Sequence, residues 1–181
     1  MKFHPLTTER LHLRKVIQAD APFVLKGYSN DAITKFMLYR YYTLDEVQTQ
    51  MNHYASMYQN KTGIAWLIEH LITKEPIGII SIFNLSTIHK KTEIGFWSLP
   101  EYWGNGYITE AAKAVIAFCF DALQLNRIEA TVETEHMASI AVIKKLQLEH
   151  EGTFKEYEIN NGSFIDLMMF AILKKNYHKS L

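Results

Sequence analysis

The chain has 181 residues, of which 48% are hydrophobic and 21% charged, and its 19 Lys and Arg residues balance its 19 Asp and Glu residues. This composition is typical of a globular protein, and we expect one domain over residues 1–181; the zero net charge argues against a nucleic-acid partner held by bulk electrostatics. No segment approaches the ~20 apolar residues of a membrane span and the N-terminus lacks a secretory signal, so we expect a cytoplasmic protein with no membrane partner.

The first half of the chain is predicted to begin with a strand and two helices and to end in a β-hairpin. Asp20 is placed to cap the first helix, and Thr43 and Glu46 have the spacing of a capping box that opens the second. The hairpin is indicated by two apolar runs joined by the turn residues "TKEP". In chain order, the predicted elements are 11–16, 20–27, 43–59, 63–71 and 77–85.

The second half is predicted to alternate strands with helices before a terminal hairpin. Apolar residues recur at helical spacing from Ala111 to Ala122, and Cys119, the only cysteine, is expected in the core of that helix, with no disulfide to form. "NNG" is a typical hairpin turn. The predicted elements are strand 91–99, helix 107–123, strand 127–134, helix 139–146, and strands 151–159 and 163–173. Together the two halves predict a mixed α/β fold.

A turn with two glycines, Gly104 and Gly106, precedes the helix at 107, and the stretch 99–111 contains no Lys or Arg. A helix start leaves about four backbone N–H groups without partners and carries roughly half a positive charge. Glycines let a ligand approach that backbone and permit positive φ. The turn therefore predicts a main-chain cradle for a phosphate or pyrophosphate, with a plain tight turn as the alternative.

Three ligand classes use such a cradle. A dinucleotide fingerprint would need a third glycine where Thr109 stands, and a nucleotide P-loop would need Gly-Lys-Ser/Thr, which is absent. Coenzyme A is the third class. Because a bare Gly-x-Gly is a weak signal, the choice depends on the surrounding sequence.

Five stretches occur in a characteristic order: "TERLHLRKVIQADA", "EIGFW", "PEYWGNGYITEA", "LNRIEATVE" and "SIAVIKKLQLEHEG". They closely resemble the GNAT acetyltransferases, specifically the branch of the ribosomal-protein N-terminal acetyltransferases. The resemblance implies the GNAT fold, a central, mostly antiparallel twisted sheet with helices on both faces. It also implies acetyl-CoA as cosubstrate and an amine acceptor.

The resemblance implies a set of cofactor-binding residues in three places. They are the end of the strand before the turn, which splays from its neighbour to pair with the pantetheine arm; the acyl-CoA loop; and the start of the helix at 139. These residues are Trp97, Ser98, Leu99, Trp103, Gly104, Asn105, Gly106, Tyr107, Ile108, Thr109, His136 and Ser139. The chain departs from the family pattern at Ile108, which is bulkier than usual, and at His136, where the family has Asn.

Two catalytic candidates follow from the implied reaction, direct acetyl transfer to a neutral amine. By resemblance Ser139 hydrogen-bonds the CoA sulfur, although it could instead cap the helix after it. The tyrosine that serves as acid elsewhere in the family is replaced by Ile143. Glu93 could deprotonate the amine through water or be a solvated strand residue. Glu110 is expected to meet the helix dipole and do no more. No metal-ligand spacing is present.

The acceptor pocket is implied by resemblance to lie near the aromatic stretch 35–43, with Phe36, Tyr39, Tyr41 and Tyr42 as its lining or, alternatively, as core residues. The acceptor is either a protein N-terminal α-amine or a small-molecule amine such as a polyamine, an antibiotic or an amino-acid derivative. The weak base candidates favour an α-amine, whose pKa is ~8. A non-catalytic acyl-CoA-binding module is the alternative from another class, and a homo-oligomer stays open.

Overall fold

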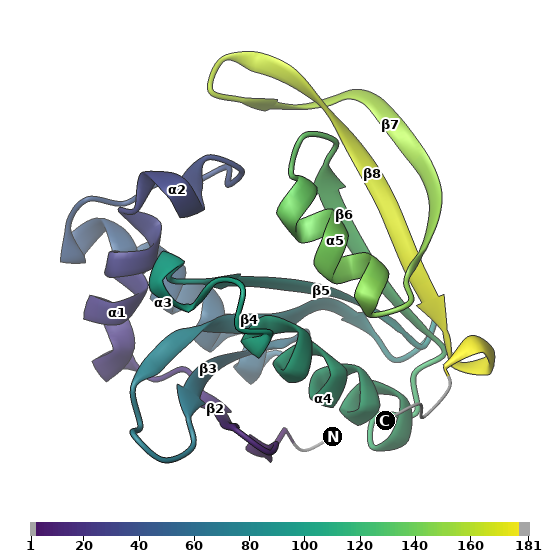
Figure 1. The fold of residues 1–181 in the computed structure, drawn as a ribbon, viewed down its shortest axis with the longest axis horizontal. Coiled ribbons are helices and arrows are strands. Elements are labelled where there is room, and N and C mark those ends of the chain that lie inside the picture. The colour runs from purple at the N-terminus through teal and green to yellow at the C-terminus, as the bar shows by residue number, and fades with distance from the viewer. Residues whose placement is uncertain (1–2, 178–181) are drawn as a thin grey trace.

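The structure, a computed structural model, describes residues 3–177 (Figure 1). Its strands are β1 (Leu6–Thr7), β2 (Leu11–Lys15), β3 (Ile64–His70), β4 (Pro76–Ser86), β5 (Lys91–Ser98), β6 (Arg127–Glu133), β7 (Glu149–Asn160) and β8 (Ser163–Leu173). Its helices are α1 (Ala21–Tyr28), α2 (Asp31–Thr34), α3 (Leu44–Gln59), α4 (Tyr107–Asp121) and α5 (Met137–Lys145). Short 3-10 turns are η1 (Gln18–Asp20), η2 (Pro100–Tyr102) and η3 (Lys174–Asn176).

The strands form one eight-stranded sheet in the order β1-β2-β3-β4-β5-β6-β8-β7. Every neighbouring pair is antiparallel except β5 and β6, which run parallel and pair only over Lys91–Glu93 and Arg127–Glu129. Beyond Glu93, β5 stays paired with β4 as far as Ser98, while β6 stays paired with β8. A gap therefore opens between β5 and β6 in the middle of the sheet, and the predicted mostly antiparallel sheet is confirmed.

The central strands are buried on both faces, because helices cover each face of the sheet (Figure 1). Ala65 and Leu67 of β3 pack with residues of α1 and α3, while the alternate residues Trp66 and Ile68 pack with α4. Successive side chains of a strand point to opposite faces, so a strand covered twice reads as a continuous apolar run. This explains the unbroken apolar stretch at 64–68.

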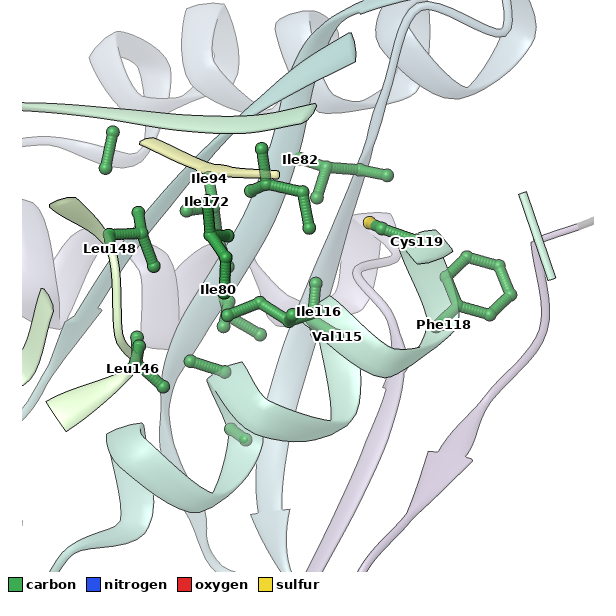
Figure 2. Close-up of a cluster of buried hydrophobic side chains, with 14 of the residues drawn as sticks. Ile80, Ile82, Ile94, Val115, Ile116, Phe118, Cys119, Leu146, Leu148 and Ile172 are labelled. Atoms are coloured by element: carbon green, nitrogen blue, oxygen red, sulfur yellow. The ribbon is translucent and has the colours of Figure 1, made fainter. Parts of the chain in front are cut away.

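Helix α4 lies against the face that β4, β5 and β8 share, and Figure 2 shows Val115, Ile116 and Cys119 on the side of the helix that meets that layer. Val115, Ile116 and Cys119 contact a cluster that includes Ile80 and Ile94. Cys119 is fully buried, and this burial raises the pKa of its thiol well above the ordinary value. The predicted core role of Cys119 is confirmed, and the packing fixes the start of α4 at the mouth of the β5–β6 gap.

The predicted capping box at the start of α3 is confirmed. The Thr43 hydroxyl accepts from the Glu46 N–H at 3.2 Å, and the Glu46 carboxylate accepts from the Thr43 N–H at 3.1 Å. We expect Thr43→Ala to lower the free energy of unfolding by ~1 kcal/mol, because one helix N–H loses its partner. Urea unfolding measures the loss, and Thr43→Ser, which keeps the hydroxyl, should be close to the original protein. Equal losses in the two variants would contradict the capping role.

Three local predictions need correction. Asp20 precedes α1, but its carboxylate accepts from Arg14 and from the Ile17 N–H rather than from the helix. Helix α5 begins at Met137, so Ser139 is its third residue and not its cap. The short elements β1 and α2 were not predicted, since two and four residues are too few to show a period. Within residues 3–177, no helix has the length and apolar character that a membrane crossing needs.

Candidate active site

The gap between β5 and β6 widens into a cavity of about 910 Å³. One wall is the end of β5 with the glycine turn and the start of α4. The opposite wall is the end of β6 with one side of α5, and the segment 32–38 lines the cavity next to them. The cavity therefore joins a helix N-terminus, a strand edge without a partner and the loop after α2.

The free edge of β5 presents only alternate backbone groups to the gap. The Leu99 N–H donates to the Ile77 carbonyl at 3.0 Å, and hydrogen-bonded residues alternate along an antiparallel pair. The backbone groups of Trp97 and Leu99 therefore face β4, whereas those of Phe96 and Ser98 face the gap. The Ser98 carbonyl already accepts from Trp103 Nε1 at 2.8 Å.

This alternation changes the residues assigned to the strand end. Leu99 is buried in the core beneath α1 and α3 and does not line the cavity. Trp97 lines the cavity, but its ring stacks on Phe23 at 5.5 Å. Phe96 also lines the cavity, and sequence reasoning missed it. The alternation of residues along β5 could have identified Phe96. Which alternate residues face the gap is known, however, only once the register of β5 with β4 is known.

Both glycines of the turn have the conformation that the sequence predicts for them. Gly104 has φ +77° and Gly106 has φ +78°, the left-handed region that other residues rarely adopt. Gly106 is the N-cap of α4 and no side chain caps the helix, so the first N–H groups of α4 stay available. Asn105 does not line the cavity; its side-chain amide donates to the carbonyls of Tyr102 and Trp103.

A cation does stand beside the turn, contrary to the expectation from the local sequence. Arg10, from the β1–β2 connection, donates through Nη1 to the Asn105 carbonyl at 3.1 Å and through Nε to Glu110 at 2.6 Å. Its guanidinium lies over the Tyr107 ring, 4.7 Å from the centroid. Glu110 also accepts from the Thr8 hydroxyl at 2.6 Å and the Arg10 N–H at 2.9 Å. Glu110 therefore does more than meet the helix dipole.

The start of α5 brings two predicted residues to the cavity wall. His136 is the N-cap of α5 and stacks almost parallel on Phe36, with ring centroids 4.1 Å apart. Burial, and next the nearby Lys35 ammonium, lower the pKa of His136, so its imidazole is neutral at pH 7. Ser139 is half-buried and lines the same wall.

Of the four aromatic residues predicted for the acceptor pocket, Phe36 alone lines the cavity. Tyr39 and Tyr42 are 63% and 66% exposed, and Tyr41 packs on Tyr28 with centroids 5.2 Å apart. The aromatic density of the stretch thus reflects solvent exposure and local packing more than a shared pocket.

Several carboxylates line the cavity. Glu133, Glu135 and Glu158 line it. Buried Asn160 donates to Glu133 Oε1 at 2.6 Å and to the Lys35 carbonyl at 3.4 Å, which joins the β7–β8 hairpin to the loop after α2. Lys35 and Lys145 line the cavity as well, so two positive charges partly offset the three carboxylates.

Glu93, the predicted base, does not line the cavity. It lies in the short stretch where β5 still pairs with β6, and its carboxylate accepts from Asn84 Nδ2 at 2.8 Å. The structure therefore does not bring Glu93 to the other site residues. Among residues 3–177, no group of three His, Cys, Asp or Glu side chains is placed to hold a metal ion.

Known proteins resemble the chain in sequence and in fold. The acetyltransferase (GNAT) domain family matches residues 10–149. The uncharacterized N-acetyltransferase YoaA of Bacillus subtilis is 35% identical over 173 residues, which cover 95% of this chain and 98% of YoaA.

Two solved structures share the fold at 21% identity. Spermidine N-acetyltransferase from Vibrio cholerae, with CoA and spermine, has a TM-score of 0.83 over 93% of this chain and 98% of its own. RimL, a ribosomal L7/L12 alpha-N-protein acetyltransferase in complex with CoA, has a TM-score of 0.85 over 93% and 96%. With the family match and the 35% identity over nearly the whole length, the chain belongs to the GNAT family of acetyltransferases.

Proposed function

We propose that the chain transfers the acetyl group of acetyl-CoA directly to the α-amine of a protein or peptide N-terminus, as in the ribosomal-protein branch of the family. The observation that carries the proposal is the β5–β6 gap, which ends on the left-handed glycine turn at the start of α4. This arrangement offers an anion cradle, a strand edge and a side-chain pocket in one cavity of about 910 Å³.

The site has the donors that acetyl-CoA requires. The turn at Gly104–Gly106 offers uncapped N–H groups and a helix dipole to the pyrophosphate. The backbone groups of Phe96 and Ser98 face the gap, where they can pair with the pantetheine amides. Trp103, Tyr107, Ile108 and Thr109 complete the cofactor end of the cavity. Bound there, acetyl-CoA supplies an activated thioester.

Transfer needs a neutral amine, a stabilised oxyanion and a leaving thiolate. The amine nitrogen attacks the thioester carbonyl carbon, the C–S bond breaks and the amine loses a proton. Ser139 is assigned to hydrogen-bond the departing sulfur, which leaves readily because the pKa of a thiol is ~8.5. His136, neutral and on the cavity wall, replaces Glu93 as the group proposed to take the proton.

The α-amine is preferred because of its pKa. An α-amine has a pKa of ~8 and is roughly a tenth neutral at pH 7, whereas a lysine amine near ~10.4 is neutral to less than about one part in a thousand. A weak base such as a half-buried imidazole suffices for the first and not for the second. RimL, an alpha-N-protein acetyltransferase, shares the fold of this chain at 21% identity.

A polyamine is the second candidate, favoured by a specific observation. The carboxylates of Glu133, Glu135 and Glu158 line the cavity and outnumber its two lysines, so they suit a cationic acceptor. The Vibrio cholerae structure with spermine has the same fold. The two candidates differ in one measurable respect, since a polyamine has no α-amine of low pKa.

We expect kcat/KM for a peptide α-amine to exceed that for the lysine of an N-blocked peptide and that for spermidine. Because the reactive form is the neutral amine, kcat/KM should rise with pH and level near ~8. Thiol release measured with a panel of acceptors tests this. Faster acetylation of spermidine would move the polyamine to first place. CoA binding with no turnover of any amine would instead indicate a non-catalytic binding module.

A further inference from the structure

The two glycines of the turn have almost no packing around them, although Asn105 between them donates to the carbonyls of Tyr102 and Trp103. A Cβ on Gly104 would have no heavy atom within 4 Å, and one on Gly106 would meet only Arg10, at 3.6 Å from Nη2. Glycine loses more conformational freedom on ordering than any other residue. A cradle that must present several N–H groups to one ligand therefore benefits from a further contact that orders it before the ligand binds.

Arg10 makes that contact from outside the cavity. It comes from the connection between β1 and β2, and it donates to the carbonyl of Asn105, the residue between the two glycines, at 3.1 Å. The same side chain donates to Glu110 at 2.6 Å, so one planar guanidinium joins the turn to the first turns of α4. A guanidinium can satisfy two acceptors at fixed geometry, whereas an ammonium is a point charge.

Glu110 would otherwise harm a pyrophosphate site. Its carboxylate lies near the start of α4, where a second negative charge repels the ligand. Partial burial alone would raise the pKa of Glu110, but hydrogen bonds from Thr8 and Arg10 outweigh burial and keep the pKa below its ordinary value. The carboxylate is thus ionised, and its charge is matched by Arg10 within the same contact.

We propose that Arg10 is a positioning residue for the cofactor: by joining the Asn105 carbonyl to Glu110, it holds the Gly104–Gly106 turn in the shape that receives the pyrophosphate of acetyl-CoA. The proposal rests on the proposed function of the same site. Arg10 does not line the cavity, so it acts through the turn rather than by touching the reacting atoms. The alternative interpretation is that Arg10 has only a structural role and attaches the β1–β2 connection to α4.

The test measures CoA affinity and compares the rates with two acetyl donors. Arg10→Ala should weaken CoA binding about 10- to 100-fold by calorimetry, since the turn loses a charge-assisted contact. The KM for acetyl-CoA should rise by a similar factor, while kcat at saturation stays unchanged. With S-acetyl-pantetheine, a donor without the pyrophosphate, kcat/KM should not change. Arg10→Lys should retain most of the defect, because one ammonium cannot hold both acceptors.

Arg14→Ala is the matched control. Arg14 lies on the following strand and pairs with Asp20 and Glu69, each at 2.8 Å, far from the turn. Its loss removes two ion pairs that are at least as buried as the Arg10–Glu110 pair, and it should leave the affinity for CoA unchanged. Arg10→Lys, which keeps a positive charge beside Glu110, provides the second variant if Arg10→Ala does not fold.

Two results would overturn the proposal. One is unchanged CoA affinity in folded Arg10→Ala and Arg10→Lys proteins. The other is an equal fall in kcat/KM of Arg10→Ala with acetyl-CoA and with S-acetyl-pantetheine, which would mean that Arg10 has only a structural role. A starting protein that binds no CoA would instead overturn the proposed function itself.

Discussion

Replacing Gly106 by valine is expected to weaken CoA binding by more than about 100-fold, the equivalent of losing two charge-assisted hydrogen bonds. Gly106 has φ +78°, where a β-branched side chain is strained, so valine would rotate the peptide planes that present the N–H groups. The valine methyls would also occupy the surface of the turn. Calorimetric titration with CoA measures the effect.

Gly162→Val is the matched control for backbone strain. Gly162 has φ +79°, nearly the same conformation, and a Cβ there meets nothing within 4 Å. It lies in the turn between β7 and β8 and does not line the cavity. The control should lose a comparable amount of stability and keep its affinity for CoA. Unchanged affinity in a folded Gly106→Val protein would show that the turn does not hold the pyrophosphate.

Ser139→Ala is expected to lower kcat about 10²-fold, the low end of the range for a positioned acid, because the thiolate leaves well without help. The affinity for CoA should change little, since one hydroxyl contributes little to so many contacts. Steady-state rates with saturating acetyl-CoA and the best acceptor provide the measurement.

Ser139→Thr keeps the hydroxyl and should retain most of the rate. No loss in Ser139→Ala would remove the residue from the mechanism. A loss far above 10²-fold, or a parallel loss in the threonine variant, would indicate that Ser139 supports the helix α5 or the acceptor instead.

Features that are local in the sequence could be predicted. The capping box at Thr43 and Glu46 needs only four residues, and the positive φ of Gly104 and Gly106 follows from the need for glycine at a strand-to-helix turn. Strands such as β3, covered on both faces, showed as apolar runs. For these elements, the residues that determine the local structure lie within the same short stretch of sequence.

Features set by long-range contacts could not be predicted from such stretches. Arg10 and Glu110 are 100 residues apart, and no local pattern relates them. The exposure of Tyr39 and the position of Glu93 outside the cavity depend on how whole elements pack. The gap-facing backbone of Phe96 depends on the register of β5 with β4, which a strand does not determine by itself.

The most direct test of the account is a crystal structure of the chain with CoA bound. The account predicts phosphate oxygens about 3 Å from the N–H groups of the Gly104–Gly106 turn and the start of α4. It also predicts pantetheine amides paired with the backbone of Phe96 and Ser98, and the sulfur beside Ser139. CoA bound outside the β5–β6 gap, or a pyrophosphate held by lysine side chains away from the turn, would contradict it.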